Sequence, residues 1–420
     1  MKPLRIDLVS PPFHGHLHPL LGLAGALQGL ATVRVLTTSD ALPAVHAAGL
    51  EGLPLLQGHE AEVWGLPNTL RPVCGKPWML WKQLRQNLAL LPFLQADLKA
   101  LWTDQRPDLA LVDFTLPSAG YLARSLGMRW WTSHVSPLAI ETPDAPPTYL
   151  GGLLPSDSPL ARLRDALGRR CIRGFKRAAF VLQSRRLSPL GLSGPYRSDG
   201  SEQAYSDECI LALGLQELEF ARHWPKALRW VGPVLHSPAL AAPEPRWDPR
   251  RKNVLVTLGT HLPYLRQRLP ALLSGWAGAL PGVHLHYSAG GQDAGTQQGG
   301  ENWTVYPYLN YGRGLARFDA LVHHGGAGIS YHALRTRRPV VVWPQDYDQF
   351  DFAARLQHRG LALWCRRPAD MPALLTRALA SGPELHAARP FAEAIDSADL
   401  RQSLRAALEQ DASLRSLVPA

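Results

Sequence analysis

The chain has 420 residues, an apolar fraction of 46% and a formal net charge of +10 at pH 7. This length exceeds the usual size of one hydrophobic core, so we expect two domains of about 200 residues each. No apolar run reaches the roughly eighteen residues of a transmembrane helix, the amino terminus does not resemble a signal segment, and the four cysteines have no paired spacing. We therefore expect a cytoplasmic protein with reduced thiols.

The net positive charge predicts attraction to an anionic partner. Three kinds of partner fit: a nucleotide phosphate, an acidic membrane surface or a nucleic acid. Much of the excess is arginine scattered along predicted helices, which is typical of a solvated surface, as at Arg162, Arg164, Arg169, Arg170 and Arg173. No nucleic-acid motif accompanies the charge, so nucleic acid is not an expected partner. Peripheral contact with an anionic membrane surface, at the inner face of the membrane, stays open.

The amino-terminal half alternates predicted strands and helices. Leu4–Ser10 is a predicted strand, residues 11–19 a proline-bounded loop, Leu20–Leu30 a helix and Ala31–Thr38 the next strand. Further strands are predicted at Leu109–Asp113, Trp130–His134, 178–184 and 209–213. This rhythm is typical of a doubly wound parallel sheet, in which the first and fourth strands are neighbours and ligands bind beyond their carboxyl ends.

The loops at those two strand ends carry His16 and Asp113. A histidine held by a carboxylate suits a general base near neutral pH, because the carboxylate fixes the tautomer and stabilises the imidazolium. Asp113 alone could equally cap the following helix, but the pairing favours a catalytic dyad. Alternating His14, His16 and His18 also fit a metal-dependent hydrolase, although no His-Glu-x-x-His or aspartate-rich companion occurs.

Residues 78–91 carry an apolar stripe at helical spacing, with Lys82 and Arg85 between its members, and Pro92 should kink or end that helix. Such a stripe is usually core. It could also line an apolar acceptor pocket or touch a membrane surface. Residues 136–155, rich in proline, have the composition of a shaped loop at the same sheet edge as Asp113.

A glycine turn organises the carboxy-terminal half. The strand Ala320–Val322 runs into three glycines within four residues, and a helical pattern resumes at Ser330. A glycine turn at a helix N-terminus suits a phosphate, and His324 could add a side-chain donor. The next strand, 339–343, ends in a polar cluster that includes Asp348 and Gln349, which indicates a diphosphate at the first loop and a polyol at the second.

The motif His324-Gly325-Gly326-Ala327-Gly328, with Pro339, Pro344 and Asp348-Gln349 at fixed spacings, resembles the donor signature of the nucleotide-sugar glycosyltransferases of family one. Gly15-His16-Leu17-His18-Pro19 resembles the same family's G-H-x-x-P loop. The resemblance implies the α/β GT-B fold, with two facing Rossmann-like domains and a cleft between them. It further implies an acceptor-binding domain at 1–235, a linker at 236–252, a donor-binding domain at 253–396 and a terminal helix, 397–420, that packs back on the first domain.

The resemblance also implies roles for individual residues. His16 would deprotonate the acceptor, and Asp113 would orient the His16 imidazole. The donor-binding set would be Thr260, Tyr306, His324, Gly325, Gly326, Gly328, Ile329, Ser330, His332, Asp348 and Gln349. No metal and no cofactor is implied, since the nucleotide sugar is a co-substrate. Three positions depart from the family pattern. Val305 and Tyr308 replace the Trp and Gln of W-x-P-Q, and His332 replaces a ribose-binding glutamate, which leaves open whether the donor is a UDP- or a dTDP-sugar.

We therefore expect an inverting glycosyltransferase that moves a hexose or deoxyhexose from a UDP- or dTDP-sugar to a hydroxyl of a small acceptor of apolar or lipid-like character. A second interpretation is a binding protein that keeps the nucleotide-sugar site without turnover, suggested by the altered base and ribose positions. The metal-dependent hydrolase is a third.

Overall fold

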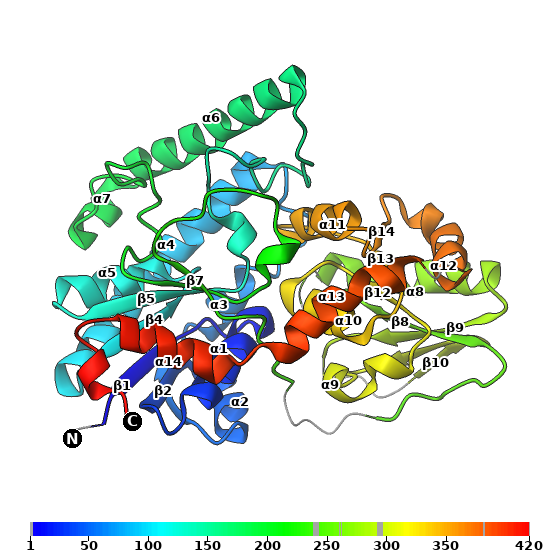
Figure 1. Cartoon of the computed structure of the whole chain (residues 1–420), viewed down its shortest axis with the longest axis horizontal. Helices are drawn as coiled ribbons and strands as arrows, with labels where there is room; N and C mark the ends of the chain where they lie inside the picture. The colour runs from blue at the N-terminus through cyan, green and yellow to red at the C-terminus, as the bar shows by residue number, and fades with distance from the viewer. Residues whose placement is uncertain are drawn as a thin grey trace.

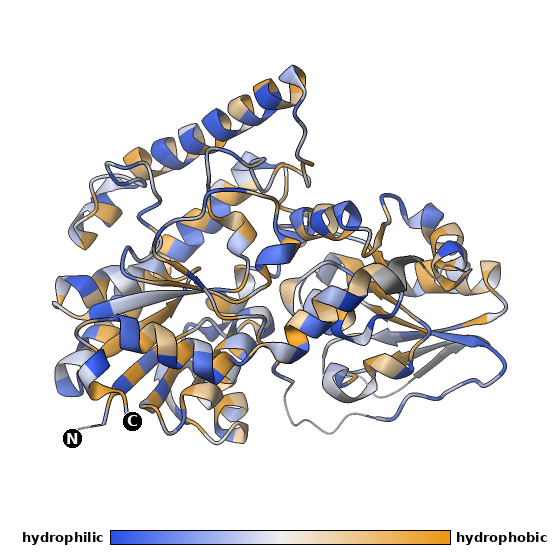
Figure 2. Cartoon of the chain, viewed as in Figure 1, coloured by the Kyte–Doolittle hydropathy of each residue, from blue (hydrophilic) through white to orange (hydrophobic). Residues whose placement is uncertain are grey.

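The computed structural model describes residues 3–237, 243–259, 261, 263–291, 297–380 and 383–419. They form two α/β lobes that lie beside each other, each built on one twisted sheet with helices on both faces (Figure 1). The expected pair of doubly wound domains is confirmed. The central strands are apolar, whereas the outer helices alternate hydrophilic and hydrophobic faces (Figure 2). None of the described helices is long and apolar enough to cross a membrane.

The described strands of the first lobe form a parallel sheet in the order β3-β2-β1-β4-β5-β6-β7. They are β1 Arg5–Val9, β2 Thr32–Thr38, β3 Glu51–Leu55, β4 Leu109–Asp113, β5 Arg129–His134, β6 Ile210–Ala212 and β7 Leu228–Trp230. The winding direction reverses between β1 and β4, where Val9 pairs with Val112. The chain therefore leaves both strands at one point on the sheet edge, as the sequence predicted.

The main helices of this lobe are α1 His14–Leu27, α2 Leu42–Ala47, α3 Glu60–Gly65, α4 Pro77–Asp104, α5 Pro117–Ser125, α6 Pro159–Leu182 and α7 Ser184–Leu187. Two predictions were wrong here. The segment 11–19 is not a loop throughout, because α1 already begins at His14 and buries Leu17 with Leu20 and Leu21. Residues 178–184 are not a strand: the helical period of α6 continues through them without a breaker, and β6 and β7 close the sheet instead.

The second sheet has the order β10-β11-β9-β8-β12-β13-β14, with only β10 antiparallel among its described strands. These are β8 Lys252–Thr257, β9 Val283–Ser288, β10 Gln297–Gly300, β11 Trp303–Tyr306, β12 Ala320–His323, β13 Val340–Val342 and β14 Leu363–Trp364. The helices are α8 Pro263–Ala279, α9 Tyr311–Gly314, α10 Ala327–Thr336, α11 Gln349–His358, α12 Met371–Ala380, α13 Pro383–Ser397 and α14 Leu400–Gln410. The winding reverses between β8 and β12, so this lobe also presents a ligand-binding edge.

The two lobes are packed against each other and tied by the end of the chain. Helix α14, red in Figure 1, lies along α1 and buries Leu404 and Leu408 in the core of the first lobe. On the other side of the contact, Phe220 packs in one cluster with Phe352 of the second lobe. The buried guanidinium of Arg355 lies 2.7 Å from the carboxylate of Glu219, which Arg222 also approaches at 3.4 Å, so one buried carboxylate compensates the charge of two arginines at this contact.

The sheet of the first lobe depends on close packing behind β5. A Cβ atom on Gly120 of α5 would lie 2.2 Å from the ring of the buried Trp130. We predict that Gly120→Ala lowers the free energy of unfolding by about 1–3 kcal/mol, since either the ring or the helix must shift. The matched control is Gly25→Ala in α1, where the added methyl meets nothing within 4 Å and should stabilise the chain by up to about 1 kcal/mol. Urea unfolding measures both, and equal stability of the two variants would contradict this packing.

Candidate functional site

A cavity of about 610 Å³ lies between the two lobes and is lined by both. From the first lobe it receives the β1–α1 segment, the end of β4 and the inner side of α4. From the second lobe it receives the ends of β8, β12 and β13. The edges at which both sheets reverse their winding thus face one cavity, which is where doubly wound sheets bind ligands.

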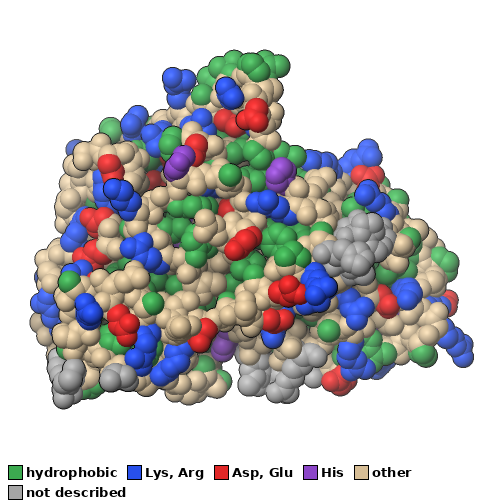
Figure 3. All heavy atoms as spheres, viewed as in Figure 1, with side chains coloured by type: hydrophobic (Ala, Val, Ile, Leu, Met, Phe, Trp, Pro, Cys, Tyr) green, Lys and Arg blue, Asp and Glu red, His purple; other side chains and the backbone are tan. Residues whose placement is uncertain are grey.

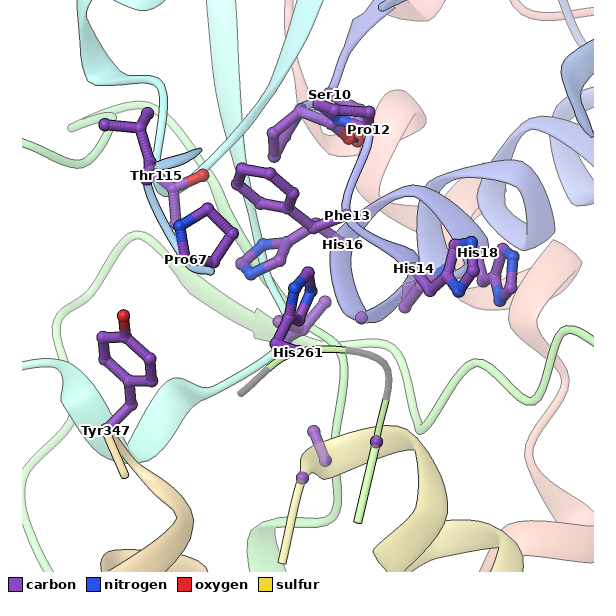
Figure 4. Close-up of a pocket in the computed structure, with 18 of the residues that line it drawn as sticks. Ser10, Pro12, Phe13, His14, His16, His18, Pro67, Thr115, His261 and Tyr347 are labelled. Carbon is purple, nitrogen blue, oxygen red and sulfur yellow. Dashed lines mark hydrogen bonds between the residues drawn. The ribbon is translucent and has the colours of Figure 1, made fainter. Parts of the chain in front are cut away.

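The first turn of α1 and the end of β4 bring His16 and Asp113 together. The imidazole Nδ1 of His16 lies 3.1 Å from both carboxylate oxygens of Asp113, which is completely buried and also accepts a hydrogen bond from the N–H of Thr115. The His16 side chain is 21% exposed and lines the cavity (Figure 4). Because Nδ1 is held by the carboxylate, Nε2 is the ring nitrogen that remains available to a ligand.

The contact between His16 and Asp113 shifts the pKa of both side chains. Burial raises the pKa of Asp113, but the charge and hydrogen bond of His16 and the Thr115 hydrogen bonds outweigh it, so this pKa lies below its usual value of 3.8. Burial lowers the pKa of His16, but Asp113, and to a lesser degree Asp348, reverse that effect and leave the pKa above 6.5. An ionised carboxylate therefore supports an imidazole that accepts a proton readily.

Aromatic rings hold the His16 imidazole from two sides. Phe114 stacks on it with ring centroids 5.4 Å apart and stacks with its other face on His134, at 4.1 Å. Phe13 presents an edge at 6.1 Å. Burial lowers the pKa of His134 to about 3, so it stays neutral in this stack. We did not predict Phe13, Phe114 or His134 as site residues, although the two phenylalanines adjoin the predicted motifs in the sequence.

The three alternating histidines do not converge on one point. All three line the cavity, but His14 and His18, one helical turn apart, stack with centroids 4.8 Å apart, whereas His16 turns away from them toward Asp113 (Figure 4). Within the described part of the chain, no group of three His, Cys, Asp or Glu side chains is arranged to hold a metal ion. This geometry gives no support to the hydrolase interpretation.

The predicted glycine turn ends β12 and starts α10 at Ala327, three residues earlier than expected. Gly325 has a φ of 90°, which favours glycine, and a Cβ there would lie 2.9 Å from the carbonyl oxygen of Gln349. Gly326 caps the helix without a side-chain hydrogen bond, and residues 326–329 line the cavity. The first N–H groups of α10 thus have no intrahelical acceptor and carry the positive end of the helix dipole, which makes them an anion site.

The imidazole of His324 lies between two glycines beside this helix start. A Cβ on Gly326 would be 2.5 Å from the ring, and one on Gly259, at the end of β8, would be 3.0 Å away. Burial lowers the pKa of His324 to about 4, so it offers a neutral hydrogen-bonding group. Among the described lining residues there is no lysine or arginine. A bound anion would therefore be met by backbone N–H groups and neutral side chains.

The remaining predicted donor residues divide into two groups. Ile329, Gly328, His332, Asp348 and Gln349 line the cavity, and burial lowers the pKa of His332 to about 4. Gly325 and Ser330 are not among the lining residues, because Gly325 shapes the turn and the Ser330 hydroxyl donates to the Gly326 carbonyl within the helix. Thr260 lies outside the described residues.

Tyr306 is also placed away from the cavity. Its side chain is fully buried, its hydroxyl accepts a hydrogen bond from the N–H of Arg246, and its carbonyl accepts one from the N–H of Ala289. Tyr306 is therefore not among the residues that line the cavity. Tyr308 and Tyr311, which follow in the sequence, line the cavity instead.

The polar cluster after β13 reaches across to the first lobe with three consecutive side chains. The Asp346 carboxylate accepts hydrogen bonds from the backbone N–H groups of Val73 and Cys74, at 2.6 Å each. The Tyr347 hydroxyl accepts one from the amide of Gln83, at 2.7 Å, and the Asp348 carboxylate accepts one from the Ser136 hydroxyl. We predicted Asp348 but not its two neighbours, since a sequence of polar residues does not indicate which of them cross a cleft.

Phe13 also contacts His261, a residue that we did not single out. The two rings are edge to face with centroids 5.5 Å apart, and His261 projects toward His16 in the cavity (Figure 4). Its Nδ1 lies 3.2 Å from the side-chain oxygen of Asn68, and burial lowers its pKa to about 3. His261 comes from the segment after β8, so a neutral imidazole of the second lobe faces the dyad of the first.

We predict that Asp113→Asn lowers the pKa of His16. The carboxylate is the main influence that raises this pKa, whereas burial, which lowers it, persists in the variant. Ring-proton NMR titration of the histidines measures the shift. The control is Asp370→Asn, a change to an exposed carboxylate that pairs with Arg367 in the second lobe. An unchanged His16 titration in Asp113→Asn would contradict the dyad.

Comparisons with known proteins agree with the geometry. No protein-family model matches the chain. The O-mycaminosyltylonolide 6-deoxyallosyltransferase of Streptomyces fradiae is 25% identical over 408 residues, which cover 90% of this chain and 88% of that protein. The structure of the kitacinnamycin glycotransferase superposes with a TM-score of 0.73 at 22% identity, over 99% of this chain and 100% of that one. The glycosyltransferase SsfS6 of Streptomyces sp. SF2575, complexed with thymidine diphosphate, gives 0.66 at 18% identity, over 96% and 99%. The resemblance found in the sequence is thereby confirmed: the chain has the GT-B fold and is similar to the nucleotide-sugar glycosyltransferases of family one.

Proposed function

We propose that this protein is an inverting, metal-independent glycosyltransferase. It would move a hexose or deoxyhexose from a UDP- or dTDP-sugar to a hydroxyl group of a small apolar acceptor. The observation that carries the proposal is the His16–Asp113 contact of 3.1 Å at a cavity whose opposite wall is a helix start with no side-chain cap. One relative, matched over 90% of this chain, is named as a 6-deoxyallosyltransferase, which supports a deoxyhexose as the transferred sugar.

In the proposed reaction, Nε2 of His16 takes the proton of the acceptor hydroxyl while Asp113 stabilises the imidazolium that forms. The acceptor oxygen bonds to the anomeric carbon from one face as the bond to the diphosphate oxygen breaks on the other, so the configuration inverts. The raised pKa of His16 supports this role, since the proton acceptor is stronger than free imidazole. The flanking rings of Phe13 and Phe114 favour one orientation of the base.

The leaving diphosphate would bind at the start of α10. Its charge would be met by the N–H groups at residues 327–329 and by His324, in place of a metal ion. The absence of lysine and arginine from the described lining supports a site that relies on oriented backbone dipoles. Asp348 and Gln349 would bind the sugar hydroxyls, and His332, which makes at most one neutral hydrogen bond to a ribose, leaves both UDP and dTDP as donors.

The acceptor would be largely apolar. Part of the cavity wall in the first lobe is a group of aliphatic side chains from the ends of β3 and α3 and from α4, namely Leu55, Leu56, Val63, Leu66, Leu80, Leu84, Leu90, Leu91 and Leu94. A charged acceptor would be desolvated there without a counter-ion, which is unfavourable. We further infer that the domain of the first sheet binds the acceptor and that of the second sheet the donor, with the boundaries at 235 and 253.

The proposed setting is the cytoplasm. All four cysteines of the chain are free, which supports a reducing compartment. The anionic membrane contact expected from the composition would involve a surface outside the cavity, and helix α6 provides the candidate.

We predict that His16→Ala abolishes transfer, with a loss of at least about 100-fold, and leaves nucleotide-sugar affinity within about twofold of the original. The reason is that His16 acts on the acceptor, whereas the diphosphate site lies on the other lobe. Mass spectrometry over a panel of apolar alcohols, with dTDP- and UDP-hexoses, measures transfer, and calorimetry measures affinity. His46→Ala, an exposed histidine of α2, is the control. Persistent transfer by His16→Ala would refute the base assignment, and binding without turnover by the original chain would favour a binding protein.

We predict that Gly326→Ala weakens dTDP and UDP binding by about tenfold or more, because its methyl would displace the His324 ring beside the helix start. Gly278→Ala, an exposed position of α8 where a methyl meets nothing within 4 Å, is the matched control in the same lobe. Thermal shift with both nucleotides, and with GDP for comparison, measures the effect. Equal affinities in the two variants would place the diphosphate elsewhere.

A further inference from the structure

Helix α6 lies at the edge of the first lobe, above α4 and away from the second sheet (Figure 1). Only one narrow side of its 24 residues is buried, with Ala161, Asp165 and Ala179. A Cβ atom on Gly168 would meet Leu150 and Pro147, so this side rests on the loop at 147–150. Most of the helix surface is thus free of contacts with the described remainder of the chain.

The outward side of α6 carries an apolar stripe. Leu160, Leu163, Leu167 and Val181 recur at helical spacing, and each is more than half exposed. Between them the same side continues through small exposed residues, Cys171, Gly174 and Ala178. Hydrophobic side chains gather at this end of the molecule in Figure 3. A surface helix normally turns its apolar stripe toward the core, whereas the apolar stripe of α6 faces solvent.

Arginines flank the stripe on both sides. Arg164 lies on one side of it, and Arg170 and Arg177 lie on the other, all three exposed. Arg164 pairs with the single acid of the helix, the buried Asp165, and Arg162, which is exposed farther round the helix, lies 4.0 Å from Asp157. The other cations of α6 turn inward: Arg169 donates to the Ala145 carbonyl, and Arg173 and Lys176 pair with Glu141. The outward side thus combines apolar side chains with the positive charges of Arg170 and Arg177, which form no ion pair with the described residues.

We propose that the outward face of α6 docks on the surface of an anionic lipid bilayer. Leucine and valine side chains would enter the interface between head groups and acyl chains, and the flanking arginines would bind lipid phosphates, which is the pattern of an interfacial amphipathic helix. Pairing with a second copy is disfavoured, because it would set arginine flanks against arginine flanks. It would also place three small residues, which supply no packing knobs, at the centre of the contact.

The apolar surface continues from α6 toward the cavity. Tyr149 lines the cavity and is 42% exposed, and the next residue, Leu150, is exposed and packs against Gly168 of α6. The stripe at 78–91 contributes less than its sequence indicated, because Leu88 and Leu91 are buried in the core and only its first residue, Trp78, is widely exposed. The bilayer contact does not require the proposed transfer reaction, and each is testable without the other.

The test is co-sedimentation of the full chain with vesicles of phosphatidylcholine containing about 30% phosphatidylglycerol, against phosphatidylcholine alone. We expect binding to the anionic vesicles only, weakened by salt. Leu163→Glu combined with Leu167→Glu should abolish it, and Arg170→Gln with Arg177→Gln should weaken it by about 10- to 30-fold. Arg367→Gln with Arg389→Gln, which removes two exposed charges from the second lobe, is the matched control and should bind like the original chain.

A second readout reports which helix enters the lipid. Cys171 lies in the middle of the stripe and is exposed, whereas Cys209 and Cys365 are buried, so a polarity-sensitive thiol dye can be attached to Cys171 in a Cys74→Ser background. A blue shift on addition of anionic vesicles would support insertion of α6. Vesicle binding that the stripe variants leave unchanged, or binding without a shift of the dye, would overturn the proposal. A third result would also overturn it: the chain fails to bind vesicles and forms a dimer in solution, and Leu163→Glu with Leu167→Glu converts that dimer to a monomer.

Discussion

The contact between the buried carboxylate of Asp113 and the imidazole of His16 is the constraint on which the rest of the site depends. A carboxylate without solvent is unfavourable unless its charge is compensated, and here the compensation comes from one histidine and the donors of Thr115. The two residues are 97 positions apart, and only the pairing of β1 with β4 brings them together. The switch of winding direction in the first sheet therefore both creates the dyad and directs it toward the cavity.

The second lobe opposes this dyad with a wall that carries no cationic side chain among its described residues. A helix start, two glycines and neutral histidines take the place of lysines, which suits a ligand whose negative charge must leave again after bond cleavage. The second lobe is also hydrogen-bonded to the first lobe through three adjacent side chains, those of Asp346, Tyr347 and Asp348. The contact between the two lobes and the proposed sugar site thus share one short segment.

Much of this arrangement follows from local sequence pattern. The strand Leu109–Asp113, the glycine turn after β12 and the dyad were predictable, because buried parallel strands and glycine corners have strong local signals. Other features were not. Polar histidines hide the helix start at His14, and the short apolar run at 178–184 has no distinctive period that would separate a helix from a strand. The displacement of Tyr306 and Ser330 from the cavity, the stack of Phe114 on His134, and the cross-lobe bonds of Asp346 arise from tertiary packing, which single positions do not reveal.

The most direct test of the central claim is the pH dependence of kcat/KM for transfer, compared between the original chain and Asp113→Asn. If His16 is the base, the rate rises with pH as the imidazole loses its proton. The midpoint should lie above 6.5 in the original chain, because Asp113 raises that pKa, and should move to lower pH on a reduced plateau in the variant. A rising limb that stays in place when Asp113 is neutralised would show that another group takes the proton, and the account given for the dyad would be wrong.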